Sequence, residues 1–114
     1  MIHYMKLDTV HFEKILIGTK TIEMRLYDEK RRAINIGDTI VFTANSDDEQ
    51  KVDVEVVNIH LFKSFKELYA YLPLSKCGYA ESEIDSADAK DMEKYYSIEK
   101  QLEYGVVGIE ISKK

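Results

Sequence analysis

The sequence predicts an α+β domain, in which about five mostly antiparallel strands carry helices at the ends and in the middle of the chain. Two observations lead to this class. Some short stretches alternate between apolar and polar residues, as strands do, while others repeat apolar residues at helical spacing. Their order groups helices around a set of strands, which argues against a doubly wound α/β protein. With 114 residues and no linker, repeat or low-complexity tract, residues 1–114 are interpreted as one domain.

The first helix is predicted over about residues 9–17. Asp8 precedes it and can cap its N-terminus, and Phe12, Ile15 and Leu16 recur at helical spacing. Gly18 follows at the place where a helix end favours a left-handed residue, a conformation that glycine adopts at little cost. The helix therefore has a start signal, an apolar face and a stop signal.

A strand is predicted next, over residues 21–27, because polarity alternates cleanly there. The face expected in the core consists of Ile22, Met24 and Leu26. The opposite face carries Thr21, Glu23, Arg25 and Tyr27. Residues 28–36 are charged and poorly periodic, and they are expected to form a connection.

Two further strands are predicted over residues 39–43 and 52–62, with a polar loop at residues 44–50 between them. The turn Gly37-Asp38 leads into the first of these strands. The second is long, and its apolar positions change parity near Val56-Val57, which predicts a bulge or bend.

The C-terminal half continues with helices, a loop and a last strand. Ser64 and Glu67 have the spacing of a capping box, which predicts a short helix from Ser64 to about Tyr71 that Pro73 ends. The remaining segments are predicted, in order, as a loop at residues 74–83, a helix at residues 86–96 and a strand at residues 104–112.

Charge and cysteine content exclude several classes of protein. The net charge is −5, divided into +1 over residues 1–40 and −6 over residues 41–114, so a broad basic surface for long duplex DNA is not expected. Cys77 is the only cysteine, which excludes an internal disulfide and favours a reducing, cytoplasmic location. The sequence carries neither a recognisable signal peptide nor an apolar run of the roughly 20 residues that a membrane span requires.

One segment combines residues that suggest chemistry. Gly18 is followed by Lys20, and the strand then carries Glu23 and Arg25 two residues apart, so that both side chains emerge on one face. Such a set can hold a polar planar ligand, because arginine binds oxygens, Glu23 accepts from an amino group and Lys20 meets an anion. The alternative is a solvated pair on an edge strand, with Lys20 favouring the dipole of the preceding helix.

These residues fill the pattern G-x-K-x-x-E-x-R, which resembles the motif of the ASCH domain family, small relatives of the PUA fold. The resemblance extends over most of the chain, through Phe12-x-x-Ile15, Lys30-Arg31-Arg32, residues 36–40, Ser64-Phe65-x-x-Leu68 and residues 104–109. It implies a PUA-like β-barrel of five or six strands with peripheral helices and a cleft lined by the motif. It also implies a small bacterial protein that acts on RNA or nucleotides, as a binder or as a hydrolase.

Within that family, the small acetylcytidine amidohydrolases are closest in size. Their catalytic set is a lysine, a threonine three residues later and a downstream glutamate. Lys20 matches the lysine, but Glu23 stands at the threonine position, and a carboxylate cannot replace a hydroxyl as an acyl-accepting nucleophile. The downstream glutamate falls near Glu81, with Glu83 as the competing choice. Glu23 beside Lys20 would hold the ammonium charged, which favours an anion or carbonyl clamp; hydrolysis by a water activated by Glu23 or Glu81 stays open.

Other residues could contact a ligand. Tyr27 and Tyr79 are candidates for stacking on a base, and Arg31, within the run at residues 30–32, is a candidate for binding a phosphate at the rim of the cleft. The histidines and Cys77 have no metal-ligand spacing, and no phosphate-binding glycine loop is present, so neither a metal nor a cofactor is expected.

The sequence therefore leads to one main functional hypothesis and three alternatives. The main hypothesis is a cytoplasmic domain, monomeric or weakly homodimeric, whose cleft holds a nucleoside, a nucleotide or a short single-stranded RNA. Its ligand-binding residues would be Lys20, Thr21, Glu23, Arg25, Tyr27, Arg31 and Tyr79. The first alternative is a nucleoside amidohydrolase, in which Lys20, Glu23 and Glu81 would be catalytic. The second is a single-strand ribonuclease, in which Lys20 and Glu23 would supply acid and base, and the third is an interaction module without a working cleft.

Overall fold

The computed structural model describes the backbone of residues 1–114 and every side chain except that of Asp48. Over this backbone the chain forms five strands and seven helical segments. In chain order they are β1 (Ile2–Leu7), α1 (Thr9–Ile17), β2 (Ile22–Leu26), α2 (Glu29–Arg32), β3 (Thr39–Ala44), β4 (Asp47–Phe62), α3 (Phe65–Tyr71), η1 (Leu74–Lys76), α4 (Glu81–Ile84), η2 (Ala89–Lys94), α5 (Ile98–Tyr104) and β5 (Val106–Lys113), where η marks a 3₁₀ helix.

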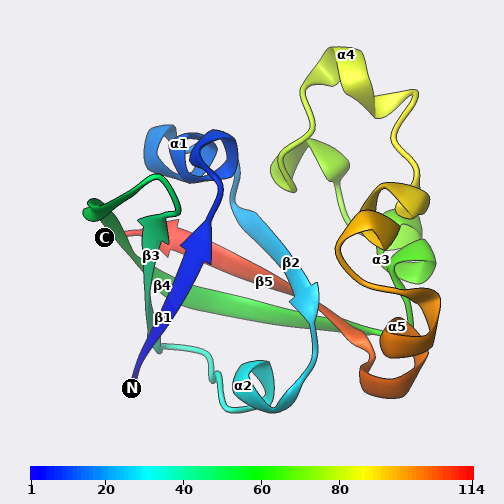
Figure 1. Cartoon of the computed structure of the whole chain (residues 1–114), viewed down its shortest axis with the longest axis horizontal. Helices are drawn as coiled ribbons and strands as arrows, with labels where there is room; N and C mark the ends of the chain where they lie inside the picture. The colour runs from blue at the N-terminus through cyan, green and yellow to red at the C-terminus, as the bar shows by residue number, and fades with distance from the viewer.

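The strands form one curled sheet, a half-barrel with the strand order β1-β3-β4-β5-β2 (Figure 1). β1 and β3 run parallel, and the other three neighbouring pairs are antiparallel. The predicted α+β class is confirmed, and the sheet is mixed rather than antiparallel throughout. β1 and β2 are the two edge strands.

Helix α1 has the predicted bounds and caps. The Asp8 side chain accepts a hydrogen bond from the backbone N–H of His11 at 2.8 Å, and Gly18 ends the helix with φ of 88°. Phe12 and Ile15 are buried against the sheet. The tight end at Gly18 brings the chain directly to Lys20 at the entry of β2, so the helix stop positions the motif lysine.

The long strand β4 contains the predicted irregularity. Its register against β5 shifts between Val56 and Asn58, which confirms the bulge expected near Val56-Val57. Before the shift β4 pairs with β3 and begins to pair with β5, and after it β4 pairs with β5 as far as Phe62. A bulge increases local twist and bends the strand, so this position helps the sheet to curl.

Several predicted segments require correction. No element is predicted over residues 2–7, but they form β1, which is held by pairing with the distant β3 and buries only Met5 and Leu7. The predicted loop at residues 44–50 is shorter, because β4 already begins at residue 47 after a two-residue turn.

The predicted helix at residues 86–96 is wrong in kind and extent. Asp88 and Ser97 each cap a separate helix, and this divides the segment into the 3₁₀ helix η2 and the unpredicted α5. Short helices also occur in segments expected as connections, namely α2, η1 and α4. The helix predicted from Ser64 is confirmed as α3, whose cap Ser64 accepts from the N–H of Glu67.

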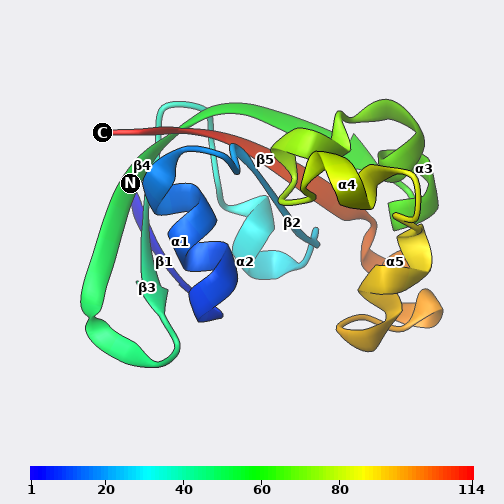
Figure 2. The same cartoon turned by 90° about the horizontal axis from the view of Figure 1, so that it is seen from above.

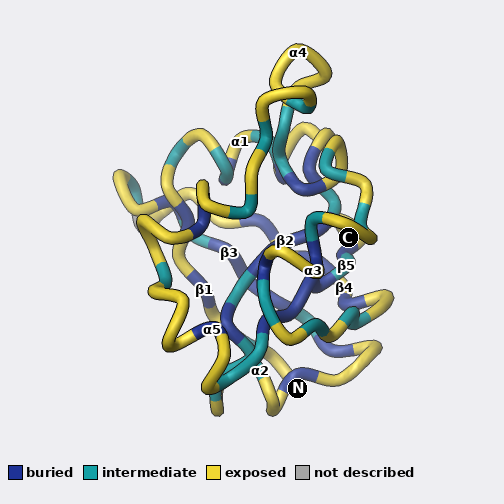
Figure 3. The backbone as a smooth tube through the Cα atoms, turned by 90° about the vertical axis from the view of Figure 1, so that its right-hand side faces the viewer, coloured by how far each residue is buried: buried dark blue, intermediate teal, exposed yellow. Residues whose placement is uncertain are grey.

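The sheet is buried on both faces along β5. Val107, Ile109 and Ile111 belong to a cluster inside the half-barrel, with Phe12 of α1, whereas Val106 belongs to a second cluster formed with α3 and η2. Figure 2 shows α1 within the curl of the strands and the helices α3 to α5 together at the other end of the molecule. Buried residues follow the strands, while the segment around α4 is largely exposed (Figure 3).

Strand β2 lies between these two environments. Ile22, Met24 and Leu26 are buried in the second cluster, as predicted for the apolar face. Glu23 and Arg25 pair in register with Ile109 and Val107, so by the alternation of side chains they lie on the side of the half-barrel interior. The polar face of β2 thus points into the barrel.

Candidate functional site

The motif residues form a continuous chain of charged contacts. Lys20 Nζ lies 2.7 Å from Glu23 Oε1, and Arg25 Nε lies 2.7 Å from Glu23 Oε2. Lys20 is only 4% exposed and Glu23 3%. These values exclude the interpretation of Glu23 and Arg25 as a solvated pair on an edge strand, because both oxygens of a buried carboxylate are held by cations.

His11 of α1 adds a further side chain to this series of contacts. Its Nδ1 lies 3.0 Å from Lys20 Nζ. Since a lysine ammonium can only donate, Nδ1 must accept, and the ring is the neutral tautomer with its proton on Nε2. Burial and the charge of Lys20 lower the pKa of His11, in agreement with a neutral ring.

Arg25 also connects the two edges of the sheet. One of its terminal nitrogens donates to the backbone oxygen of Lys6 in β1 at 2.9 Å. Because β1 and β2 are the edge strands, this bond crosses the space between them, which we call the seam. The charged chain therefore lies where the barrel fails to close.

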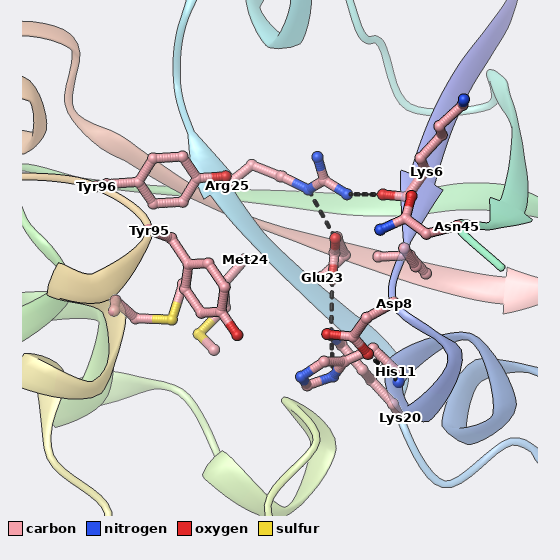
Figure 4. Close-up of a pocket in the computed structure, with 12 residues that line it drawn as sticks. Lys6, Asp8, His11, Lys20, Glu23, Met24, Arg25, Asn45, Tyr95 and Tyr96 are labelled. Atoms are coloured by element: carbon pink, nitrogen blue, oxygen red, sulfur yellow. Dashed lines mark hydrogen bonds and ion pairs between the residues drawn. The ribbon is translucent and has the colours of Figure 1, made fainter.

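A pocket of about 300 Å³ opens at the seam. Its walls come from five parts of the chain: β1 with the N-cap of α1, α1 itself, β2 with its entry, the β3–β4 turn, and the η2 region. The lining residues are Lys6, Leu7, Asp8, His11, Lys20, Glu23, Met24, Arg25, Asn45, Met92, Tyr95 and Tyr96. In Figure 4, Tyr95 and Tyr96 stand on one side, Lys6 and Asn45 on the other, and Glu23 lies between them.

The electrostatics of the pocket follow from these contacts. Burial alone would raise the pKa of Glu23, but the charges and hydrogen bonds of Lys20 and Arg25 outweigh it and lower that pKa to about 2. Burial acts to lower the pKa of Arg25, and Glu23 reverses this and raises it. With a neutral His11, the buried cluster carries two positive charges and one negative charge, so it favours an acceptor or an anion.

The structure places three of the seven predicted ligand-binding residues in the pocket: Lys20, Glu23 and Arg25. The others lie outside its lining. Tyr27 packs beneath Arg32, whose guanidinium carbon lies 4.5 Å from the ring centroid, and Tyr79 is hydrogen-bonded to Tyr69 and Asp91, each at 2.7 Å. Thr21 forms backbone hydrogen bonds with Lys76 and Ile111. Arg31 lines a second hollow, which also includes Lys30 and Lys51. The candidate catalytic residues Glu81 and Glu83 are exposed on α4.

Sequence reasoning missed His11, Asn45, Tyr95 and Tyr96 as pocket residues. The helix predicted over residues 86–96 ends in Tyr95 and Tyr96, and adjacent residues on a helix point in different directions, so that prediction does not bring both rings to one site. In the structure the helix ends before them, so both reach the pocket. Tyr96 also stacks on Phe65, while Tyr95 is 55% exposed.

Neither thiol chemistry nor a metal finds support at this site. Cys77 is buried, and that burial raises its pKa to about 11, so the thiol stays protonated at neutral pH. Among the described residues, no group of three or more His, Cys, Asp or Glu side chains is placed to hold a metal ion. Over the same residues, no helix is long and apolar enough to cross a membrane.

The fold and the pocket together define a small α+β half-barrel domain with a charged site at its seam. The ASCH domain model matches residues 5–114, and the chain belongs to the ASCH domain family. No curated protein is significantly similar in sequence.

Several solved structures share the fold of this chain. The hypothetical protein PH0355 is 36% identical, with full coverage of both chains and a TM-score of 0.82. The protein PF0455 from Pyrococcus furiosus is 34% identical over 99% of this chain and 97% of its own, with a TM-score of 0.74. ASCH from Zymomonas mobilis shares the fold at 13% identity, with a TM-score of 0.64 over 97% of this chain and 66% of its own. Pyrococcus is archaeal, so the bacterial origin stays a prediction.

Proposed function

We propose that this protein binds a nucleoside, a nucleotide or a short single-stranded RNA in the seam pocket. The family is associated with RNA binding, and the observation that carries the proposal is the buried Lys20–Glu23–Arg25 chain beneath two tyrosines. A volume of about 300 Å³ lies at the small end of ligand pockets and suits one nucleoside rather than a folded macromolecule.

The floor of the pocket supplies hydrogen-bond donors. Lys20 uses one N–H on Glu23 and one on His11, which leaves a third for a ligand. Arg25 uses Nε on Glu23 and one terminal nitrogen on Lys6, which leaves its other terminal nitrogen. A base carbonyl or a phosphate oxygen is the complementary group. Glu23, expected as an acceptor for the ligand, instead holds the two donors in place.

Tyr95 and Tyr96, which we call the tyrosine wall, supply a surface on which a base can stack. Tyr95 is exposed and Tyr96 half-buried, and both line the pocket opposite Lys6 and Asn45 (Figure 4). Stacking of one base on an aromatic side chain contributes roughly 1–3 kcal/mol and tolerates any base. This arrangement favours a single-stranded ligand, because the bases of a duplex are already stacked on each other.

The same contacts favour binding over hydrolysis. Glu23, with a pKa of about 2, is a weak general base at neutral pH. The acceptor nitrogen of His11 is occupied by Lys20, and Glu81 lies outside the pocket lining. We therefore expect no cytidine from acetylcytidine and no cleavage of labelled RNA; chromatography that detects either product would replace binding with catalysis.

The test is fluorescence anisotropy with a labelled single-stranded RNA hexamer, with unlabelled nucleosides and nucleotides as competitors. Tyr95→Ala removes an exposed side chain and should raise Kd at least fivefold. Tyr71→Ala is the matched control, since Tyr71 is 74% exposed on α3 and lies outside the pocket lining. No binding by the wild type, or equal Kd for the two variants, contradicts the proposal.

A further inference from the structure

A second hollow lies beside the seam pocket, on the side of β1 that meets α2, β3 and β4. Four of its lining residues are cationic, namely Lys6, Lys30, Arg31 and Lys51, and Tyr4 and Thr43 complete much of its wall. No carboxylate belongs to this lining among the described side chains. In a chain with a net charge of −5, such a grouping of cations is a local departure from the overall balance.

The sheet register explains half of this grouping. Lys6 of β1 pairs with Thr43 of β3, and Thr43 pairs with Lys51 of β4. Residues paired in register project from the same face of a sheet, so these three form one row across the strands. The next row on that face consists of Tyr4, Val41 and Asp53. The carboxylate of Asp53 therefore marks the end of the positively charged region on that side.

Helix α2 brings the other two cations. Asp28 caps α2 by accepting from the N–H of Arg31, and this starts the short helix after a two-residue connection from β2. The Arg31 guanidinium is held loosely by that same carboxylate, at 3.3 and 3.5 Å, and its Nε has no hydrogen-bond partner among the described residues. Only Nη1 of Arg31 contacts that carboxylate and Nε is buried, so the donor capacity left for an anion lies on the other terminal nitrogen.

Lys6 joins the hollow to the seam pocket, because it lines both. The backbone oxygen of Lys6 accepts a hydrogen bond from Arg25, so Lys6 is in direct contact with the charged residues of the seam pocket. Tyr4 of β1 lines the hollow, and Asp8, which follows β1, lines the pocket. Four residues of extended chain cover about 13 Å, so the hollow and the pocket adjoin along an edge of about that length.

We propose that this hollow binds a backbone phosphate of the ligand whose base occupies the seam pocket. The ligand is then a single-stranded oligonucleotide of at least two nucleotides, running from the tyrosine wall across Lys6 to Lys30, Arg31 and Lys51. This inference rests on the proposed function and makes it more specific: nucleosides occupy the pocket alone, whereas RNA engages both sites.

The experiment compares Lys30→Gln/Lys51→Gln with Lys66→Gln/Lys100→Gln, two pairs of exposed lysines that change the net charge equally. Only the first pair lines the hollow. At low salt, the first variant should raise the Kd of the labelled hexamer about tenfold and reduce the slope of log K against log salt by about one. The Kd of a competing nucleoside should stay unchanged, and the second variant should change neither.

The outcomes separate the two proposals. If the wild type binds no RNA, both are wrong. If it binds RNA and Tyr95→Ala weakens binding, but Lys30→Gln/Lys51→Gln leaves the Kd and the salt slope at wild-type values, only the phosphate site is wrong. An equal loss in Lys66→Gln/Lys100→Gln also overturns the site, because it would show a general charge effect.

Discussion

Both faces of β2 are largely buried, but the environments that bury them differ. Ile22 and Met24 pack among apolar side chains beneath α3 and η2. One residue away along the strand, Glu23 is 3% exposed and has its carboxylate held by Lys20 and Arg25 in place of apolar neighbours. The apolar face joins the strand to the helices, and the polar face supplies the charged groups of the pocket, which Met24 also lines, so burial alone does not separate core from site.

The largest expected effect comes from removing the charge of Glu23 on the polar face of β2. Glu23→Gln removes the negative charge between two buried cations and should lower the free energy of unfolding by about 3–5 kcal/mol, as found when one partner of a buried ion pair is removed. Urea denaturation measures this, with Glu55→Gln, an exposed strand glutamate, as control. A loss below about 1 kcal/mol would mean that the cluster is open to water.

The second expected effect is a pH dependence confined to the polar face. The folded-state pKa of Glu23, about 2, lies below its ordinary value of 4.5, so the unfolded chain binds this proton more readily. Stability from Glu23 is complete above about pH 5 and is lost as the pH falls toward 2, in total about 3.5 kcal/mol at roughly 1.4 kcal/mol per pKa unit.

Acid denaturation followed at several pH values measures this loss, and Glu23→Gln should show a flatter profile. Asp38 has a pKa lowered to about 2 by hydrogen bonds from His3 and the backbone of Asn35, and it titrates in the same range. The Asp38→Asn background removes that contribution. Parallel profiles for Asp38→Asn with and without Glu23→Gln would contradict the prediction.

A third prediction compares Gly78, which lies beside the pocket residue His11, with Gly108, which lies against apolar side chains of the second cluster. A Cβ at Gly78 would lie 3.2 Å from His11 Cε1, at φ of 110°, whereas a Cβ at Gly108 would lie 2.6 Å from Leu72 Cδ1 and 3.3 Å from Ile22 Cγ2. Each change to Ala should cost about 1–3 kcal/mol, the first by backbone strain and the second by overpacking. Only Gly78→Ala should weaken RNA binding, since it displaces His11; equal RNA affinities for the two variants would contradict this.

The smallest expected effect comes from the apolar face. Ile22→Val removes one buried methylene and should cost about 0.5–1.5 kcal/mol in thermal or chemical unfolding. RNA affinity should remain that of the wild type, because Ile22 does not line the pocket. A change in affinity without a larger loss of stability would show that the two faces are coupled.

The accuracy of the sequence predictions varied with the range of the interactions involved. The bounds of α1, the cap of α3 and the bulge near Val56-Val57 follow from local signals, and all three are confirmed. β1 has a partner far along the chain, and no local pattern reveals a parallel pairing with β3. Tyr95 and Tyr96 both line the pocket and do not end one long helix, because caps at Asp88 and Ser97 divide the predicted helix into two.

The sequence alone determined the α+β class and the alternation that places Glu23 and Arg25 on one face of a strand, because these follow from periods of two and 3.6 along the chain. Only the tertiary structure decided that this face points into the half-barrel. That outcome depends on how far the sheet curls and on the Arg25 bond to Lys6 across the seam. Contacts between β1 and β2 join segments with no shared local pattern, and they turn a polar strand face into a pocket.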